Sequence, residues 1–87
     1  MDLKEIRQDI DRIDREMVDL FCRRMELAAQ VAAYKKENNM EIHVPEREQQ
    51  ILENISRQAG QEMSPYIRQL YDTLFALSRD YQSEVIR

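Results

Sequence analysis

The sequence predicts an all-α fold with three helices per chain, and three observations support this class. Apolar residues in the first 34 positions recur at steps of three and four, which is the spacing of one helix face. The chain has one Gly and two Pro, which leaves little material for the turns of a β-rich fold. Both prolines stand where a helix can begin. We therefore expect one domain, residues 1–87, with a long, a short and a medium helix.

The first helix is expected from about residue 3 to about residue 37. Its apolar seam consists of Leu3, Ile6, Ile10, Ile13, Met17, Leu20, Leu27, Val31 and Tyr34. At 1.5 Å per residue, such a helix is about 50 Å long. A chain of 87 residues cannot bury this seam by itself, so we expect a partner, most simply a second copy in coiled-coil-like packing.

Local signals mark the two shorter helices. Asn38 is expected to end the first helix, and a short loop follows it. Pro45 fits the first turn of the second helix, and Gly60 fits its C-cap. Ser64 followed by Pro65 is a suitable N-cap and N1 pair for the third helix.

Charge and composition argue against several classes of protein. The net charge is −4 and no basic block occurs, so we expect no nucleic-acid partner. No apolar run approaches the ~20 residues of a membrane span, and the N-terminal segment is amphipathic rather than a signal peptide. We therefore expect a cytoplasmic protein with no membrane partner. One Cys and one His are poor material for a disulfide or a metal site.

Polar side chains interrupt the apolar face of each predicted helix. Arg24 occupies a seam position, where burial of an unpaired cation costs several kcal/mol, and Lys35 follows about 16 Å further along the helix. The complete set is Arg24, Lys35, Arg47, Glu48, Ser78 and Gln82. This set is mostly cationic although the chain is acidic. It indicates a pocket for a small polyanion, and carboxylates suit it because a guanidinium binds them through two parallel hydrogen bonds.

Each of these residues also has a simpler interpretation. Arg24 alone could reach the surface of a loosely packed seam, or only specify register and oligomeric state. Lys35 stands beside Lys36 and could be a solvated charge. The other four are compatible with helix-start electrostatics or with surface positions. Six such residues on three inward faces favour a binding site.

The chain resembles the all-helical (type II) chorismate mutase family over nearly its whole length. The likeness lies in LKEIRQDIDRIDREMVDLFCRRMELAAQVAAYKK, VPEREQQIL and YIRQLYDTLFALSRDYQ. These segments carry two Arg and then a Lys on the first helix, an Arg-Glu pair opening the second, and a Ser and a Gln on the third. The resemblance implies an intertwined homodimer with two active sites that convert chorismate to prephenate. It also implies that no cofactor is needed.

The resemblance assigns some of these residues to the two carboxylates of the dianionic substrate. Arg24 would bind one carboxylate. Arg7 would bind the other in the partner's site, because it lies about 25 Å along the helix from Arg24. Arg47 would support the carboxylate network, and Ser78 would assist near the ring carboxylate.

Other residues are assigned to the reacting bond and the ring hydroxyl. Lys35 and Gln82 would donate hydrogen bonds to the ether oxygen of the breaking bond, and Glu48 would accept the ring hydroxyl. Many relatives carry Asp at the position of Val44. If a backbone N–H fills that role, Val44 can still serve, and if the carboxylate is required, hydroxyl binding is weakened.

Two alternative functions fit parts of the pattern. Isochorismate pyruvate lyase resembles this family and uses a similar cationic pocket, although Glu48 together with Gln82 favours the mutase. A non-catalytic helical dimerisation module from a larger aromatic-pathway enzyme would explain the apolar seam and the short chain. It would not explain the inward cations.

Overall fold

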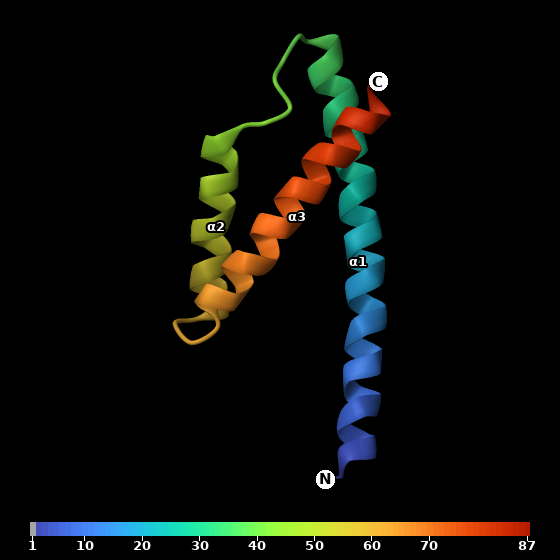
Figure 1. The fold of residues 1–87 in the computed structure, drawn as a ribbon, viewed down its shortest axis with the longest axis vertical. Helices are drawn as coiled ribbons and strands as arrows, with labels where there is room; N and C mark the ends of the chain where they lie inside the picture. Colours follow the sequence, from blue (N-terminus) through green and yellow to red (C-terminus); the bar gives the residue numbers. More distant parts are fainter. Residues whose placement is uncertain (1) are drawn as a thin grey trace.

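The computed structural model describes residues 2–87 and contains three helices (Figure 1). Helix α1 spans Leu3–Glu37, α2 spans Pro45–Ala59 and α3 spans Ser64–Val85. No strand occurs in this part of the chain. The predicted class, the number of helices and their order are therefore confirmed.

The C-terminal end of α1 follows the motif in which a left-handed residue closes a helix. Asn38 is the C-cap, as predicted, and Asn39 has φ of 55°, a conformation that Asn tolerates better than most residues. The N–H of Met40 donates to the carbonyl of Lys35 (2.8 Å), and the N–H of Asn39 donates to that of Lys36 (3.3 Å). This closure fixes the backbone of Lys35 in the last turn of α1.

The boundaries of α2 and α3 agree with the local signals except at one residue. Pro45 opens α2, and Gly60 ends it with φ of 87°, a region that favours glycine. The predicted N-cap role of Ser64 is wrong, because this residue already lies in the first turn of α3 and Met63 precedes the helix. The N–H of Ser64 donates to the carbonyl of Gly60 (2.9 Å), so the turn between the helices leads directly into α3.

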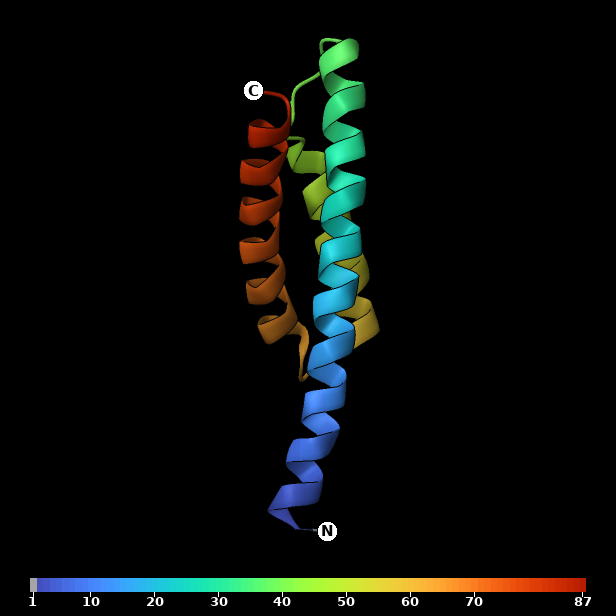
Figure 2. The same cartoon turned by 90° about the vertical axis from the view of Figure 1, so that its right-hand side faces the viewer.

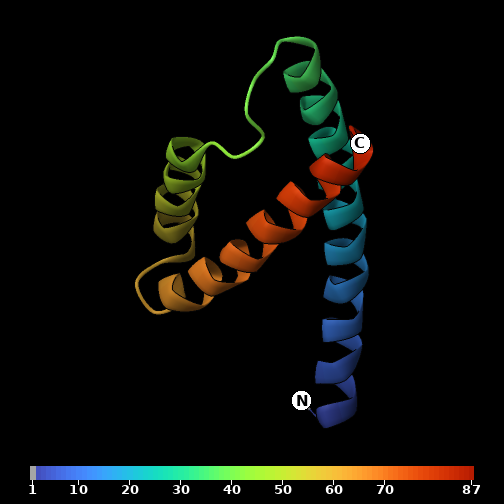
Figure 3. The same cartoon turned by 45° about the horizontal axis from the view of Figure 1, so that its top comes forward.

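Helix α3 is the element that connects the other two. It packs against both α1 and α2, whereas α1 and α2 do not pack against each other within residues 2–87. Figures 1 and 3 show α3 crossing obliquely from the end of α2 to the C-terminal half of α1. The N-terminal half of α1 projects beyond the other helices (Figure 2). At the opposite end, Nζ of Lys36 donates to the carbonyl of Ile86 (2.9 Å), which ties the end of α3 to that of α1.

The contact between α1 and α3 is built on small side chains. The buried apolar residues of the described chain are Ala28, Ala32 and Phe75, and Ala32 is 0% exposed. The Phe75 ring also packs edge-to-face against Tyr71, with a centroid separation of 5.8 Å. Because Ala has only a methyl group, α3 can approach α1 closely at this point.

The single chain is open rather than compact. Its radius of gyration is 15.9 Å, against about 12 Å expected for a compact domain of this length. Every residue of the predicted seam, from Leu3 to Tyr34, is exposed. The single chain therefore leaves the seam uncovered, consistent with the expected need for a partner. No helix within residues 2–87 has both the length and the apolar character needed to cross a membrane.

We expect Ala32→Leu to lower the free energy of unfolding by about 1–3 kcal/mol, because extra methyl groups cannot enter the closed contact without moving α3. Ala33→Leu is the matched control, since Ala33 is exposed and should change stability by less than about 0.5 kcal/mol. Chemical denaturation of both variants measures the difference. Equal stabilities for the two would contradict the close contact at Ala32.

Candidate active site

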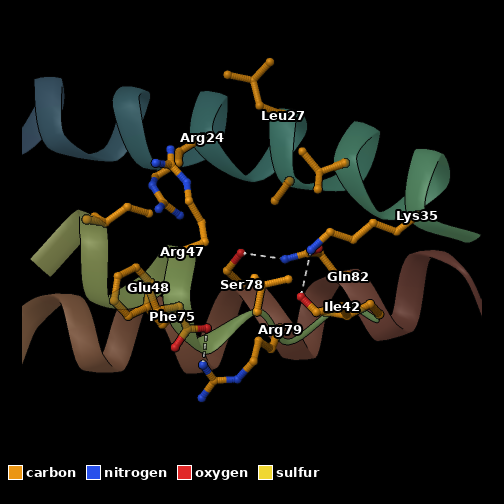
Figure 4. Close-up of a pocket in the computed structure, with 14 residues that line it drawn as sticks. Arg24, Leu27, Lys35, Ile42, Arg47, Glu48, Phe75, Ser78, Arg79 and Gln82 are labelled. Carbon is orange, nitrogen blue, oxygen red and sulfur yellow. Dashed lines mark hydrogen bonds and ion pairs between the residues drawn. The ribbon is translucent and has the colours of Figure 1, made fainter. Parts of the chain in front are cut away.

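A cavity of about 300 Å³ lies among the three helices, in the space that separates α1 from α2 (Figure 4). It is lined by residues from all three helices and from the loop before α2. They are Arg24, Leu27, Ala28, Val31, Lys35, Ile42, Val44, Arg47, Glu48, Ile51, Phe75, Ser78, Arg79 and Gln82. The cavity thus combines apolar walls with a group of charged and amide side chains, as ligand sites commonly do.

The structure brings together all but one of the residues singled out in the sequence. Those that line the cavity are Arg24, Lys35, Val44, Arg47, Glu48, Ser78 and Gln82. Arg7 is exposed on the projecting half of α1 and is not part of the cavity lining. Within one chain, the arginine predicted to act across an interface is therefore separate from the other residues.

Two arginines lie toward one end of the cavity (Figure 4). Arg24 is half-buried, and its guanidinium carbon lies 5.9 Å from the centre of the Tyr71 ring, within the range of a cation–π contact. Nη1 of Arg47 donates to Oε1 of Gln50 (2.8 Å). Within residues 2–87, neither arginine forms an ion pair with a carboxylate. Both guanidinium groups therefore retain donors for a ligand.

Lys35 reaches into the cavity from the last turn of α1. Its Nζ donates to the carbonyl of Ile42 in the loop before α2 (2.9 Å). An ammonium group has three N–H donors, so this bond orients the group and leaves others free. No carboxylate of the described chain pairs with Lys35 either. Figure 4 shows Lys35 and Gln82 directed toward the same part of the cavity from α1 and α3.

Ser78 and Gln82 form a buried polar pair on α3. They are 7% and 8% exposed, and Nε2 of Gln82 donates to Oγ of Ser78 (3.1 Å). Oε1 of Gln82 is buried and has no hydrogen-bond partner among the described residues. A buried polar atom without a partner costs about 1–3 kcal/mol, which a fold built only for stability would avoid. In this orientation of the amide, Oε1 therefore lacks a donor, and Oγ of Ser78 is the neighbouring group that would supply one if the amide turned by half a rotation.

Glu48 is the one carboxylate residue that lines the cavity. Its Oε2 accepts a hydrogen bond from Nη1 of Arg79 on α3 (2.5 Å), in an ion pair whose side chains are 32% and 22% exposed for Arg79 and Glu48. Its Oε1 lies 3.6 Å from Nε2 of His43, beyond the distance of a good hydrogen bond. The Glu48 carboxylate is thus fixed through one of its two oxygens.

Arg79 is a cavity residue that the sequence reasoning missed. Ser78 and Gln82 were singled out because they continue the helix face that carries Phe75, and Arg79 stands about 100° around the helix from Ser78. A signal was nevertheless present. Arg79 lies four residues after Phe75, so the two share one side of the helix.

The side chain of Val44 lines the cavity without contributing a charge. Val44 is the N-cap residue of α2, and its carbonyl accepts the N–H groups of Arg47 and Glu48 at 3.1 and 3.2 Å. Val44 is thus an apolar part of the wall. Glu48 must supply any carboxylate acceptor in this region of the site.

The charges of the cavity are unbalanced. Its lining includes four cations, namely Arg24, Lys35, Arg47 and Arg79, and a single carboxylate on Glu48. The whole chain, by contrast, has a net charge of −4. Residues 2–87 contain no cluster of three His, Cys, Asp or Glu side chains able to hold a metal. The arrangement favours a small anion with more than one negative charge.

Comparison with known proteins gives the same family as the sequence motifs. The chain is 48% identical over 56 residues to a bifunctional chorismate mutase/prephenate dehydratase of Aquifex aeolicus, which covers 64% of this chain and 16% of that protein. It is 46% identical over 46 residues to the T-protein of Haemophilus influenzae, covering 53% and 12%. A T-protein of Enterobacter agglomerans is 36% identical over 58 residues, covering 67% and 16%.

The matched segment is thus a small part of each of these relatives, 12% to 16% of their length. No solved structure matches the chain. The family model described as chorismate mutase type II matches residues 6–83, which include every residue of the cavity lining and Arg7. On this match, the chain belongs to the type II chorismate mutase family.

Proposed function

We propose that this protein is a chorismate mutase that rearranges chorismate to prephenate in the cavity between the three helices. The observation that carries the proposal is electrostatic. Arg24, Lys35 and Arg47 line one cavity and pair with no carboxylate of the described chain, although the chain as a whole is acidic. Chorismate is a small dianion, and its negative charge would offset part of the positive charge of this cluster.

The first contribution to catalysis is control of the substrate's conformation. The rearrangement forms a C–C bond and breaks a C–O bond within one molecule, so no group enters or leaves. Its two reacting carbons must be held close together. Arg24 and Arg47 at one end of the cavity would fix one carboxylate, and an arginine supplied from outside the chain would fix the other. Such positioning lowers the barrier because the entropy of alignment is lost on binding rather than in the reaction.

The second contribution is stabilisation of charge in the transition state. Breaking of the C–O bond runs ahead of C–C bond formation, so negative charge grows on the ether oxygen. The Lys35 ammonium and the Gln82 amide N–H would donate to this oxygen, and their bonds strengthen as the charge develops. Removal of one such donor typically costs about 3–4 kcal/mol of transition-state stabilisation.

Ser78 would support the Gln82 amide. Its hydroxyl accepts from Nε2 in the present arrangement. A hydroxyl can also donate, so it could bond to Oε1 instead if the amide turned by half a rotation. That orientation would give the buried Oε1 a partner and release both N–H groups of Nε2 for the substrate. In the observed orientation, by contrast, Oγ of Ser78 accepts from Gln82 and its own proton stays free for the ring carboxylate, the role that the family resemblance implies.

We further propose that two chains form an intertwined homodimer, with each chain acting as one domain. The apolar seam of α1 is exposed in the single chain, and α1 projects beyond α2 and α3 (Figure 2). A second copy offers an identical seam of matching length, which a twofold interface requires. In such a dimer, Arg7 of one chain could complete the cavity of the other.

The direct test is to mix purified protein with chorismate and follow the loss of its absorbance. We expect prephenate as the product, without added metal or cofactor. Because the Gln82 amide does not titrate, turnover should not fall sharply between pH 6 and pH 8. Formation of salicylate and pyruvate from isochorismate, with no prephenate from chorismate, would favour the lyase. Absence of both reactions would favour a dimerisation module.

We expect Arg24→Leu to reduce kcat/KM about 100-fold, because two charge-assisted hydrogen bonds to a carboxylate are lost. Its unfolding free energy should stay equal or rise, since leucine fits an apolar seam position and no ion pair is broken. Arg23→Leu is the matched control, because Arg23 is exposed and does not line the cavity, and it should retain activity. If Arg24→Leu instead unfolds the protein, Arg24 has a structural role.

Mixing two inactive variants tests the position of Arg7. Arg7→Ala and Lys35→Ala should each be inactive alone. In a heterodimer of the two, one site contains both mutations and the other contains neither. Co-refolding equal amounts should therefore recover about a quarter of the wild-type activity, since about half of the dimers are mixed. No recovery, with heterodimers shown by mass spectrometry, would place Arg7 in the site of its own chain or outside both sites.

A further inference from the structure

The ion pair between Arg79 and Glu48 determines which cation of the pocket pairs with its carboxylate. The pocket needs a carboxylate to accept a ligand hydroxyl, yet that carboxylate stands among three cations without carboxylate partners, namely Arg24, Lys35 and Arg47. An ionised Glu48 could pair with one of them. Such a pair would neutralise a cation that the dianionic ligand must use.

In the observed geometry, Glu48 pairs with a different cation, Arg79. Nη1 of Arg79 donates to Oε2 of Glu48 at 2.5 Å, and because both groups are charged the hydrogen bond is a charge-assisted one. Arg79 approaches from α3, whereas Glu48 lies in the first turn of α2, so the pair also links these two helices. Both side chains are more than two thirds buried, at 32% and 22% exposure, which limits screening by water.

Only one oxygen of Glu48 is occupied by Arg79. Oε1 lies 3.6 Å from Nε2 of His43, which is exposed in the loop before α2. This distance is too long for a good hydrogen bond, so Oε1 can still accept a hydroxyl proton. Glu48 thus remains an acceptor while its negative charge is balanced by a cation that is not needed for the ligand's carboxylates.

We propose that Arg79 is a positioning residue that holds Glu48 by Oε2, presents Oε1 to a ligand hydroxyl and keeps Arg24, Lys35 and Arg47 free for the dianion. The part of this inference that concerns the ring hydroxyl rests on the proposed function. The part that concerns free cations applies to any dicarboxylate that enters the cavity. Arg79 would therefore act through Glu48 and would not touch the substrate.

A double-mutant cycle separates this role from direct binding of the ligand by Arg79. Arg79→Leu should raise KM for chorismate about tenfold, the effect of one charge-assisted hydrogen bond, and change kcat less than about twofold. In a Glu48→Gln background, the same replacement should change KM by less than about twofold, because no carboxylate remains to be held. Arg79→Lys should restore most of the KM, since it keeps a cation at this position.

Three outcomes would overturn the inference. A tenfold rise in KM that persists in the Glu48→Gln background would show that Arg79 binds the ligand directly. No rise in the wild-type background would show that Glu48 does not need it. A large fall in kcat with unchanged KM, in a variant that stays folded by circular dichroism, would show that Arg79 does not act through binding of the ligand. Should Arg79→Leu fail to fold, Arg79→Gln removes the charge while keeping a hydrogen-bond donor, and the same cycle applies.

Binding of succinate makes the test independent of the proposed function. Succinate has two carboxylates but no ring hydroxyl and no ether oxygen. Its dissociation constant, measured by calorimetry, should rise in Arg79→Leu and return toward the wild-type value when Glu48→Gln is added. This pattern in a protein that does not turn over chorismate would support the role of Arg79 and reject the proposed function. Unchanged succinate binding in Arg79→Leu would reject the proposal that Arg79 keeps the other cations of the cavity free for a dicarboxylate.

Discussion

Uncompensated positive charge around one cavity is the constraint on which the arrangement of this small molecule depends. Of the four cations that line the cavity, the described chain supplies no carboxylate to pair with the half-buried Arg24 and Lys35 or with the exposed Arg47. The nearby Gln82 carbonyl is also without a partner. The half-buried Arg24 and Lys35 and the buried carbonyl oxygen cost stability while they lack partners. The unpaired cations are understandable when their missing partner is an anionic ligand, and a half rotation of the Gln82 amide would give its oxygen a donor in Ser78.

The packing of the helices is consistent with this requirement. The cavity exists because α1 and α2 stay apart, and α3 holds both of them. The close contact at Ala28 and Ala32 lets α3 approach α1 without filling the space on its other side. The chain therefore has a very small apolar core of its own. Most of its large apolar surface, including the seam of α1, remains available for a second chain.

Much of the site was predictable because the spacing of residues in a helix indicates which of them share one face. Arg24 and Lys35 stood out as charges within an apolar stripe, and Ser78 and Gln82 did so on the third helix. The structure places all four in the cavity lining. Arg79 escaped this reasoning because its position relative to the apolar line looked peripheral. Its contact with Glu48 depends on the angle at which α3 crosses α2. The spacing of residues within one helix does not predict that angle.

The sequence by itself determined the helices, their ends apart from the N-cap of α3, and most of the polar residues that line the cavity. These features depend on interactions between residues close together along the chain, such as the left-handed closure at Asn39 and the turn at Gly60. Only the tertiary structure decided that the polar residues share one cavity and that Glu48 pairs with Arg79. It also decided that the Gln82 oxygen is buried without a partner. Those outcomes depend on the distances and crossing angles between helices, which arise from packing between residues far apart in the chain.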